Sequence, residues 1–313
     1  MRTSLADRQR KTNPRSAIGI DLGDRFSEVC VLDEEGALAS QTRLRTTQAA
    51  LEGYFRGQAP ARVALETGTH SGWVSRLVAA CGHEVVVANA RELRKIHQSD
   101  RKNDRADAEI LARMVRFDPE LLAPVVHRTE QMQIDISLIR ARDVLVGART
   151  KLINAARGLT KSLGGRLPGC SSPCFARRVR DRMPKELASF LAPLLAAIDA
   201  LNEQIRCYDQ HIEELAQRYP ETTVLRQIAG VGTLTSLAFV LTLSDKARFI
   251  RSRDVGPYLG LVPRQDQSGD RSPQLPITKA GNVYLRRLLI GSAHYILGPF
   301  GPDSDLRRFG QHL

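Results

Sequence analysis

Short apolar runs alternate with turn sequences in the first third of the chain, and this pattern predicts strands. The runs are residues 17–22, 27–32, 38–46, 63–66 and 84–88. Apolar residues at helical spacing occupy the intervals between and after these runs. The predicted helices are residues 47–56, 72–81 and 104–117. Strands that alternate with helices predict an α/β domain over residues 17–124, preceded by a flexible basic arm at 1–16.

The pattern changes after Pro124. Residues 128–163 and 186–217 contain few Gly or Pro and many Arg, Leu, Ile and Ala, so each stretch predicts one long helix. We expect the two helices to form an antiparallel or coiled-coil pair, a helical arm over residues 125–221. Core packing and dimerisation both explain the weak heptad pattern of this arm.

A third unit is expected over residues 222–298. Part of this unit resembles a helix-hairpin-helix: an apolar residue is followed by Gly230 and Gly232 and then by a predicted helix at 233–243. In this motif, backbone N–H groups can bind a phosphate. An ordinary tight turn explains the glycines equally well. Residues 283–289 predict a basic amphipathic helix, so we expect a mostly helical unit, followed by a poorly patterned tail at 299–313.

Charge indicates the class of partner. The chain has 313 residues, with 46 Lys and Arg against 34 Asp and Glu, a formal net charge of +12. A surplus of this size favours a polyanion such as nucleic acid, although a merely soluble basic protein is the simpler alternative. Five scattered cysteines, no signal-peptide pattern and no apolar run near 20 residues predict a cytoplasmic protein with no membrane partner.

Four carboxylates occur in an order that predicts a metal site. Asp21 and Glu66 each lie at the end of an apolar run, and Asp104 and Asp107 are three residues apart in a predicted helix. Two strand acids and two acids on one helix face can converge, and such oxygen ligands suit Mg²⁺ or Mn²⁺. A pair of these ions can promote attack on a phosphodiester. Turn caps and a salt-bridged helix start are the structural alternatives.

Ser268 is the candidate nucleophile, although a serine before glycine in a polar loop is more often a turn residue. Ser244 is a second candidate with a stronger helix-capping explanation. Basic residues near the acids and near Ser268 are the expected contacts to nucleic acid. Together with Gly230 and Gly232, the candidates are Arg94, Lys95, Arg101, Lys102, Arg105, Arg264, Lys279, Arg286 and Arg287.

The order of the acids resembles the RuvC/RNase H-like fold of Holliday junction resolvases. The whole series of motifs resembles the DEDD-type transposases of insertion sequences, the IS110 family. The matching segments are residues 19–23, 64–68, 102–108, 228–232, 258–263, 267–269, 278–282 and 285–287. Each segment alone is a weak signal, but together they cover residues 17–297 in order.

The resemblance implies an RNA-guided DNA recombinase of a bacterial mobile element, associated with the nucleoid. Asp21, Glu66, Asp104 and Asp107 would hold magnesium, and Ser268 would attack DNA covalently. The implied partners are double-stranded donor and target DNA, a structured non-coding guide RNA, and further copies of the chain in a homodimer or tetramer. Members of the family usually continue with another basic helical stretch, so we also expect that this chain could be a truncated or decayed copy.

Two other functions fit the residues. A RuvC-like endonuclease or Holliday junction resolvase would use water as the nucleophile, and Ser268 would be only a turn residue. A non-catalytic nucleic-acid-binding protein would use the acids only as helix caps. Ser268→Ala separates the first from a serine recombinase, and magnesium dependence separates the second from both.

Overall fold

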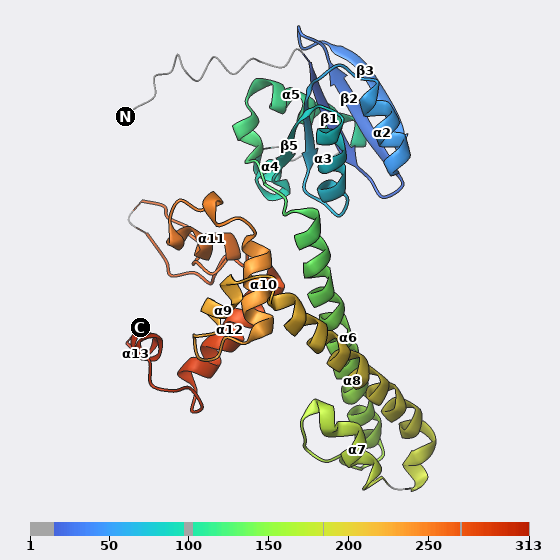
Figure 1. Ribbon diagram of the computed structural model, residues 1–313, viewed down its shortest axis with the longest axis vertical. Helices are drawn as coiled ribbons and strands as arrows, with labels where there is room; N and C mark the ends of the chain where they lie inside the picture. Colours follow the sequence, from blue (N-terminus) through green and yellow to red (C-terminus); the bar gives the residue numbers. More distant parts are fainter. Residues whose placement is uncertain (1–15, 97–102, 184, 270, 313) are drawn as a thin grey trace. The chain divides into compact units, whose positions relative to one another are not determined.

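The computed structural model describes residues 16–96, 103–183, 185–269 and 271–312. The chain divides into two compact units, with the boundary between His127 and Arg128. Unit 1 comprises the described residues up to His127, and unit 2 comprises those from Arg128 onward. Figure 1 shows a sheet with helices in unit 1 and helices with connecting loops in unit 2.

Unit 1 contains a five-stranded mixed sheet in the order β3-β2-β1-β4-β5. The strands are β1 (Ala17–Leu22), β2 (Phe26–Leu32), β3 (Leu38–Arg45), β4 (Arg62–Glu66) and β5 (Glu84–Ala88). The first three strands are antiparallel neighbours, whereas β4 runs parallel to both β1 and β5. This topology is consistent with the RuvC-like fold that the order of acids predicts.

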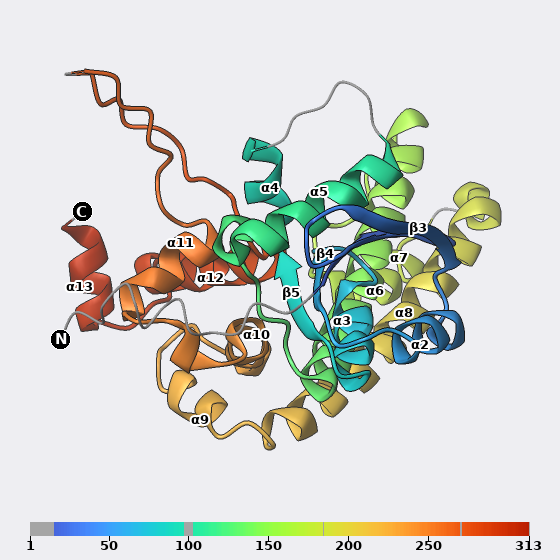
Figure 2. The ribbon, with the colours of Figure 1, turned by 90° about the horizontal axis from the view of Figure 1, so that it is seen from above.

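Helices cover both faces of the sheet, which makes three layers (Figure 2). On one face, α2 (Gln48–Arg56) and α3 (Ser71–Ala80) pack on alternate strand residues such as Ile18 and Ile20. On the other face, α5 (Asp104–Phe117) packs on the intervening residues. The short helices α4 (Ala90–Ile96) and η1 (Pro119–Leu122) flank α5 in the chain. The expected α/β domain is therefore present.

Small residues let α5 lie very close to β1. A Cβ atom built on Gly19 would lie 1.9 Å from the carbonyl oxygen of Ala108 and 2.5 Å from the amide nitrogen of Ala112. These distances are far inside normal van der Waals contact, so only glycine fits at position 19. The close approach fixes the first turns of α5 beside the end of β1.

Unit 2 begins with two long helices, α6 (Glu130–Ser162) and α8 (Ala188–Ala216). They pack side by side as antiparallel partners, joined through η2 (Ser172–Cys174), α7 (Phe175–Arg180) and η3 (Lys185–Leu187) (Figure 1). Arg142 donates to Asp209, and Arg149 donates to Asn202 at 2.9 Å. Residue numbers rise along α6 while those of its partners fall along α8, so the two helices run antiparallel. Buried α8 residues recur at alternating intervals of four and three: Leu191, Leu195, Ile198, Asn202 and Ile205.

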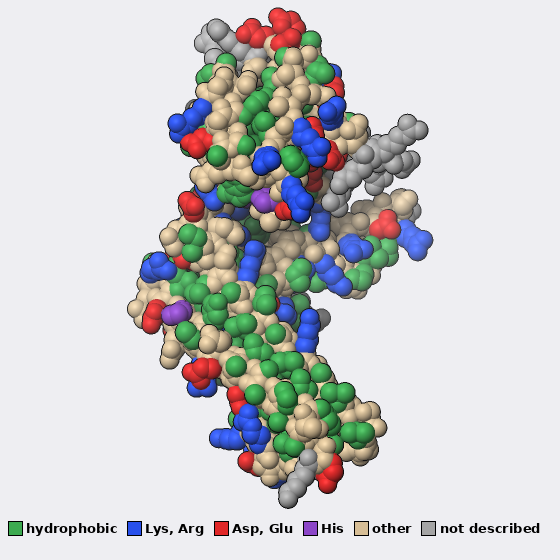
Figure 3. Space-filling view, turned by 90° about the vertical axis from the view of Figure 1, so that its right-hand side faces the viewer, with side chains coloured by type: hydrophobic (Ala, Val, Ile, Leu, Met, Phe, Trp, Pro, Cys, Tyr) green, Lys and Arg blue, Asp and Glu red, His purple; other side chains and the backbone are tan. Residues whose placement is uncertain are grey.

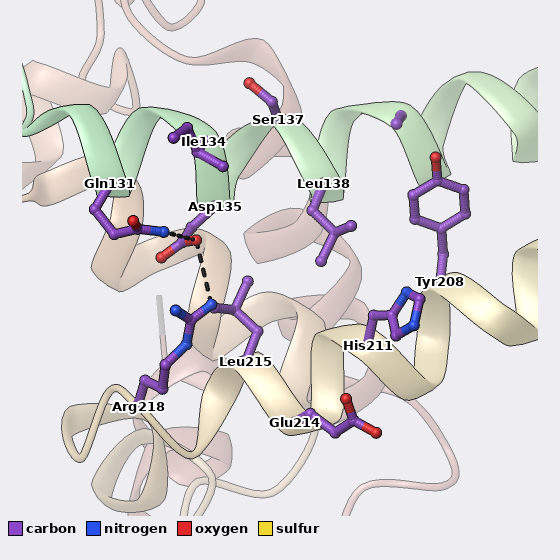
Figure 4. Close-up of a pocket in the computed structure, with 11 residues that line it drawn as sticks. Gln131, Ile134, Asp135, Ser137, Leu138, Tyr208, His211, Glu214, Leu215 and Arg218 are labelled. Atoms are coloured by element: carbon purple, nitrogen blue, oxygen red, sulfur yellow. Dashed lines mark hydrogen bonds and ion pairs between the residues drawn. The ribbon is translucent and has the colours of Figure 1, made fainter.

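A polar cluster joins the arm to the rest of unit 2. Asp135 of α6 is 3% exposed and accepts hydrogen bonds from Gln131 at 2.9 Å and from the Tyr219 hydroxyl at 2.5 Å. Arg218 lies 3.4 Å from the same carboxylate, beside a cavity of about 660 Å³ between α6 and α8 (Figure 4). Three donors thus satisfy the buried carboxylate, and this cluster is structural.

The remainder of unit 2 is helical. Its elements are α9 (Glu221–Leu225), α10 (Thr233–Leu243), η4 (Lys246–Arg248), η5 (Ser252–Asp254), α11 (Val255–Leu259), α12 (Val283–Leu297) and α13 (Asp305–Gln311). The last helix, α13, lies in the tail that was expected to be poorly patterned. Ser304 caps this helix, and Arg307 donates to the carbonyl oxygens of Ile296 in α12 and of Gly298 and Gly301 after α12. No helix in the described ranges is long and apolar enough to cross a membrane.

Candidate metal centre

Asp21 and Glu66 lie on neighbouring strands at the same edge of the sheet. The parallel register pairs Ile20 of β1 with Leu65 of β4, so Asp21 and Glu66 are the next residues along each strand. Ile20 and Leu65 point to the α2 and α3 face, and side chains alternate along a strand. Asp21 and Glu66 therefore belong to the opposite face, which α5 covers.

The first turn of α5 supplies two further carboxylates. The side chain of Asn103 caps the helix by accepting a hydrogen bond from the amide of Arg105 at 3.2 Å. Asp104 and Asp107 follow in this turn, where the helix dipole favours negative charge. Their spacing places both on one helix face, and that face is directed toward the end of β1 by the Gly19 contact.

Three of the four expected acids converge. Asp21, Asp104 and Asp107 each offer a carboxylate oxygen, and these oxygens lie within 4.8 Å of one another. Asp104 is exposed, whereas the other two are half-buried, so the group opens to solvent. Three oxygen donors at this spacing fit a hard divalent cation such as Mg²⁺ or Mn²⁺. Glu66 lies outside this close group, on the adjacent strand of the same face.

A fifth carboxylate, Glu28, lies beside Asp21 and was not predicted from the sequence. It is the direct cross-strand partner of Asp21 in the β1–β2 hairpin, and its side chain is 13% exposed. Its two oxygens lie 3.5 Å from Nε of Arg43 and 3.7 Å from Nε of Arg105. A partial signal was available, because Asp21 and Glu28 lie on either side of the predicted turn at Gly23-Asp24-Arg25, three residues before Asp24 and four residues after it.

The basic residues expected near the acids are described only in part. Arg105 lies on α5 with its side chain exposed and directed to Glu28. Arg94 and Lys95 belong to α4, but their side chains are not described. Arg101 and Lys102 lie outside the described residues.

Ser268 lies at the end of a two-stranded loop in unit 2. The loop leaves α11 at Gly260 and returns to α12 at Asn282, with bridges between Pro263 and Ile277 and between Ser268 and Arg271. Backbone hydrogen bonds of 3.2 and 3.1 Å join Ser268 and Arg271 in both directions, and Gly269 has a φ of +56°. Ser268 is exposed, as are Arg264 and Lys279 of the same loop.

Ser244 is held differently. It ends α10 with a φ of +61°, a conformation that is strained for a residue with a side chain, and its hydroxyl lies 3.5 Å from the sulfur of Met132. Gly232 caps the other end of α10 with extended backbone. Gly230 has a φ of +86°, and a Cβ there would lie 2.8 Å from the Tyr295 ring, so this glycine is needed for the turn and its packing.

Arg286 and Arg287 differ although they are neighbours on α12. Arg286 is 6% exposed and donates to the carbonyl oxygens of Leu259 and Ala280 at 2.8 and 2.5 Å. It therefore ties the two ends of the Ser268 loop together through Nη1. Arg287 is exposed, pairs with Asp143 and lies over the Tyr284 ring.

Two models of known protein families match the sequence of this chain. A transposase model of the DEDD type and the IS110 family matches residues 18–163, and a second model, for transposases of the IS116/IS110/IS902 family, matches residues 222–303. The chain belongs to the IS110 family of transposases. The first model spans all four expected acids and the second spans Ser268, so both groups of candidate residues lie inside matched regions of the transposase.

Curated relatives agree over nearly the whole length of the transposase. The chain is 30% identical to the transposase for insertion sequence element IS1328 of Yersinia enterocolitica, over 88% of this chain and 82% of that protein. It is 29% identical to the transposase for IS1111A of Coxiella burnetii, over 93% of this chain and 80% of that protein. A probable family 20 transposase of Pseudomonas aeruginosa is 26% identical, with 93% and 87% coverage.

Proposed function

We propose that this transposase is a divalent-metal-dependent, RNA-guided DNA recombinase that uses a serine nucleophile. The observation that carries the proposal is the convergence of Asp21, Asp104 and Asp107 at the edge of a RuvC-like sheet. Carboxylates this close repel one another, and cations between them would offset that repulsion. Glu66, on the adjacent strand, completes the expected set of ligands when a phosphate oxygen also binds.

Bound Mg²⁺ or Mn²⁺ would supply Lewis acidity at the scissile phosphodiester. The side chains of this chain have distinct parts in the reaction. Asp21 and Glu66 are fixed by the sheet, and Asp104 and Asp107 are fixed by the α5 cap, so the ligands need little rearrangement on binding. This rigidity supports a catalytic centre in preference to a set of independent helix caps.

Ser268 is the proposed nucleophile. Its hydroxyl oxygen would attack the phosphorus of a DNA phosphate, and its proton would pass to solvent or a nearby base. The P–O bond to one DNA strand would break, and the departing sugar oxygen would take up a proton. The exposed position of Ser268 at the end of its loop supports this role over Ser244, which is half-buried with its hydroxyl directed to the sulfur of Met132.

DNA and guide RNA would bind through basic side chains, mainly to phosphates. The net charge of +12 supports such contacts, and guide RNA would supply sequence choice by base pairing. Exposed candidates are Arg105, Arg264, Lys279 and Arg287, and the N-terminal end of α10 after Gly230 and Gly232 offers backbone N–H groups. The proposed location is the cytoplasm, at the bacterial nucleoid.

The α6–α8 arm is the proposed site of self-association as a coiled coil. The alternating spacing of buried residues on α8 supports a heptad seam within the arm, where α8 packs on α6 of the same chain, so self-association would use the exposed side chains of the arm. Val144 of α6 and Leu163, which follows the last residue of α6, are 69% and 64% exposed, and Figure 3 shows hydrophobic side chains among Lys and Arg over this part of unit 2. A homodimer or tetramer would cover some of this surface. The proposed domains keep the boundaries 1–16, 17–124, 125–221, 222–298 and 299–313.

The decisive experiment looks for a covalent protein–DNA product. Purified transposase would be incubated with Mg²⁺, RNA transcribed from the sequences that flank its gene, and labelled donor and target DNA. Denaturing gels run with and without protease would detect a protein–DNA adduct. We expect an adduct with the wild-type chain and none with Ser268→Ala or Asp21→Asn.

Two matched controls use neighbouring residues of the same type. Ser272→Ala alters an exposed serine of the same loop, and Asp24→Asn alters an exposed acid of the β1–β2 turn. Both should keep the adduct. Cleavage that survives Ser268→Ala without an adduct would instead support a hydrolytic RuvC-like endonuclease. Binding that ignores both Mg²⁺ and Asp21→Asn would support a non-catalytic nucleic-acid-binding protein.

A further inference from the structure

Glu28 occupies a position that the set of four acids leaves unexplained. It lies directly opposite Asp21 across the β1–β2 pair, on the face that α5 covers. Directly opposed residues in an antiparallel pair have Cβ atoms about 4.5–5.5 Å apart. A negative charge placed there adds to the repulsion among Asp21, Asp104 and Asp107, unless something offsets it.

Two arginines from different elements offset the charge of Glu28. Arg43 reaches it from β3, where Arg43 is its cross-strand partner and also lies 4.5 Å from the centroid of the Phe26 ring. Arg105 reaches it from the first turn of α5, the turn that carries Asp104 and Asp107. Glu28 thus binds the one described arginine that lies within the Asp104–Asp107 segment.

Arg105 could reach the metal-binding acids as well. A guanidinium that lies 3.7 Å from Glu28 needs only side-chain rotation to reach the neighbouring Asp21, given the cross-strand spacing. In that position its positive charge would compete with a divalent cation for the carboxylates. Binding to Glu28 directs it elsewhere.

We propose that Glu28 is a positioning residue of the metal centre, which holds the Arg105 guanidinium to one side so that cations bind the acids without competition from it. The inference rests on the proposed function, since it requires the acids to bind divalent cations. It assigns Glu28 no contact with metal or DNA. The ion pair itself is too exposed to contribute much to folding, because Arg105 is 66% exposed, so its effect should appear in metal affinity.

The test is a double-mutant cycle on Mn²⁺ affinity, measured with the full-length chain by electron paramagnetic resonance of unbound Mn²⁺. The Asp21→Asn variant measures Mn²⁺ binding that does not involve the proposed metal centre. Glu28→Gln should weaken Mn²⁺ binding by about three- to tenfold, and Arg105→Gln alone should change it by about twofold at most. In the Glu28→Gln background, Arg105→Gln should restore most of the lost affinity, so its effect there must be larger than its effect in wild type.

The matched control is Glu109→Gln. Glu109 forms its ion pair with Arg113 of the same helix at 2.7 Å, so this variant should bind Mn²⁺ like wild type. Thermal unfolding without metal should give similar midpoints for all variants. If Glu28→Gln has no effect, or if Arg105→Gln fails to restore affinity, the positioning role is wrong, and the second result would make Glu28 a direct ligand. If wild type and Asp21→Asn bind Mn²⁺ equally, the metal centre itself is wrong.

Discussion

Gly19→Ala gives the most direct test of how the fold builds the metal centre. The added methyl group would lie 1.9 Å from the Ala108 carbonyl oxygen, whereas normal contact begins near 3.4 Å. Strand β1 and helix α5 would therefore have to separate by about 1.5 Å at this point. Both neighbours are backbone atoms of a helix, so no flexible side chain can absorb the change.

The expected destabilisation is at the upper end for overpacking, about 3 kcal/mol. For a unit of this size, that corresponds to a fall of roughly 10–15 °C in the unfolding midpoint of unit 1. Ala108 is one residue from Asp107 and one helical turn from Asp104, so the shift also moves both carboxylates away from Asp21. We expect Mn²⁺ affinity to fall about tenfold or more, because ligand sets tolerate displacements of only about 0.5 Å.

Differential scanning calorimetry and Mn²⁺ titration would measure the two effects. Gly53→Ala is the matched control, since a Cβ at this α2 position meets nothing within 4 Å. It should stabilise unit 1 by about 0.5–1 kcal/mol, because alanine favours a helix over glycine. A Gly19→Ala protein with wild-type stability and wild-type Mn²⁺ affinity would refute the argument that close packing of α5 places the acids.

Three further predictions concern unit 2. Burial and the hydrogen bond to Asp135 raise the pKa of Tyr219, so the stability that the hydroxyl proton provides is present below pH ~10 and is lost progressively as the pH rises above it. Tyr219→Phe should lower the free energy of unfolding by about 1–3 kcal/mol at pH 7. Urea titrations of this variant should show a smaller loss of stability at alkaline pH than those of wild type. Arg286→Ala should make the Ser268 loop more sensitive to limited proteolysis, because Arg286 bonds to both ends of the loop. Arg287→Ala should leave the digestion rate of the loop unchanged and lower the free energy of unfolding by less than about 1 kcal/mol, because its ion pair with Asp143 is exposed. Ser268→Ala should leave the thermal unfolding midpoint within about 1 °C of wild type, because its side chain is exposed.

The sequence predicted the five strands and helices α2, α3 and α5 of unit 1 because each of them has a clear period, whereas the short helices α4 and η1 were not predicted. Apolar runs bounded by turns located all five strands, and the spacing of apolar residues located α5 at its observed bounds, Asp104–Phe117. The convergence of Asp21 with Asp104 and Asp107 also followed from element type and order, and the structure brings these three acids together. Local patterns were sufficient because the acids lie at element ends, where the fold fixes their direction.

Contacts between distant segments could not be predicted in the same way. The role of Arg286 depends on carbonyl oxygens at positions 259 and 280, which reach it only after the loop closes. A basic residue on an amphipathic helix is usually exposed, so the sequence indicated nucleic acid instead. Helix α13 was missed for another reason: its Ser304 cap was present in the sequence, but nearby Gly and Pro residues suggested an irregular tail.

The two groups of proposed catalytic residues are supported by very different local structure. The acids lie on a strand and on a helix that pack so closely that a single methyl group at Gly19 would separate them. Ser268 lies on an exposed loop whose two ends are held together. Gly260 packs against the backbone of Ala280, Gly281 packs against the backbone of Tyr258, and Arg286 donates to a carbonyl oxygen at each end of the loop. A preorganised centre suits metal ligands, whose geometry must not vary, whereas an exposed loop can adjust the position of a nucleophile to a bound DNA strand. Substitutions at the base of the loop should therefore impair the reaction through Ser268 without altering Mn²⁺ affinity, and substitutions around Gly19 should do the reverse.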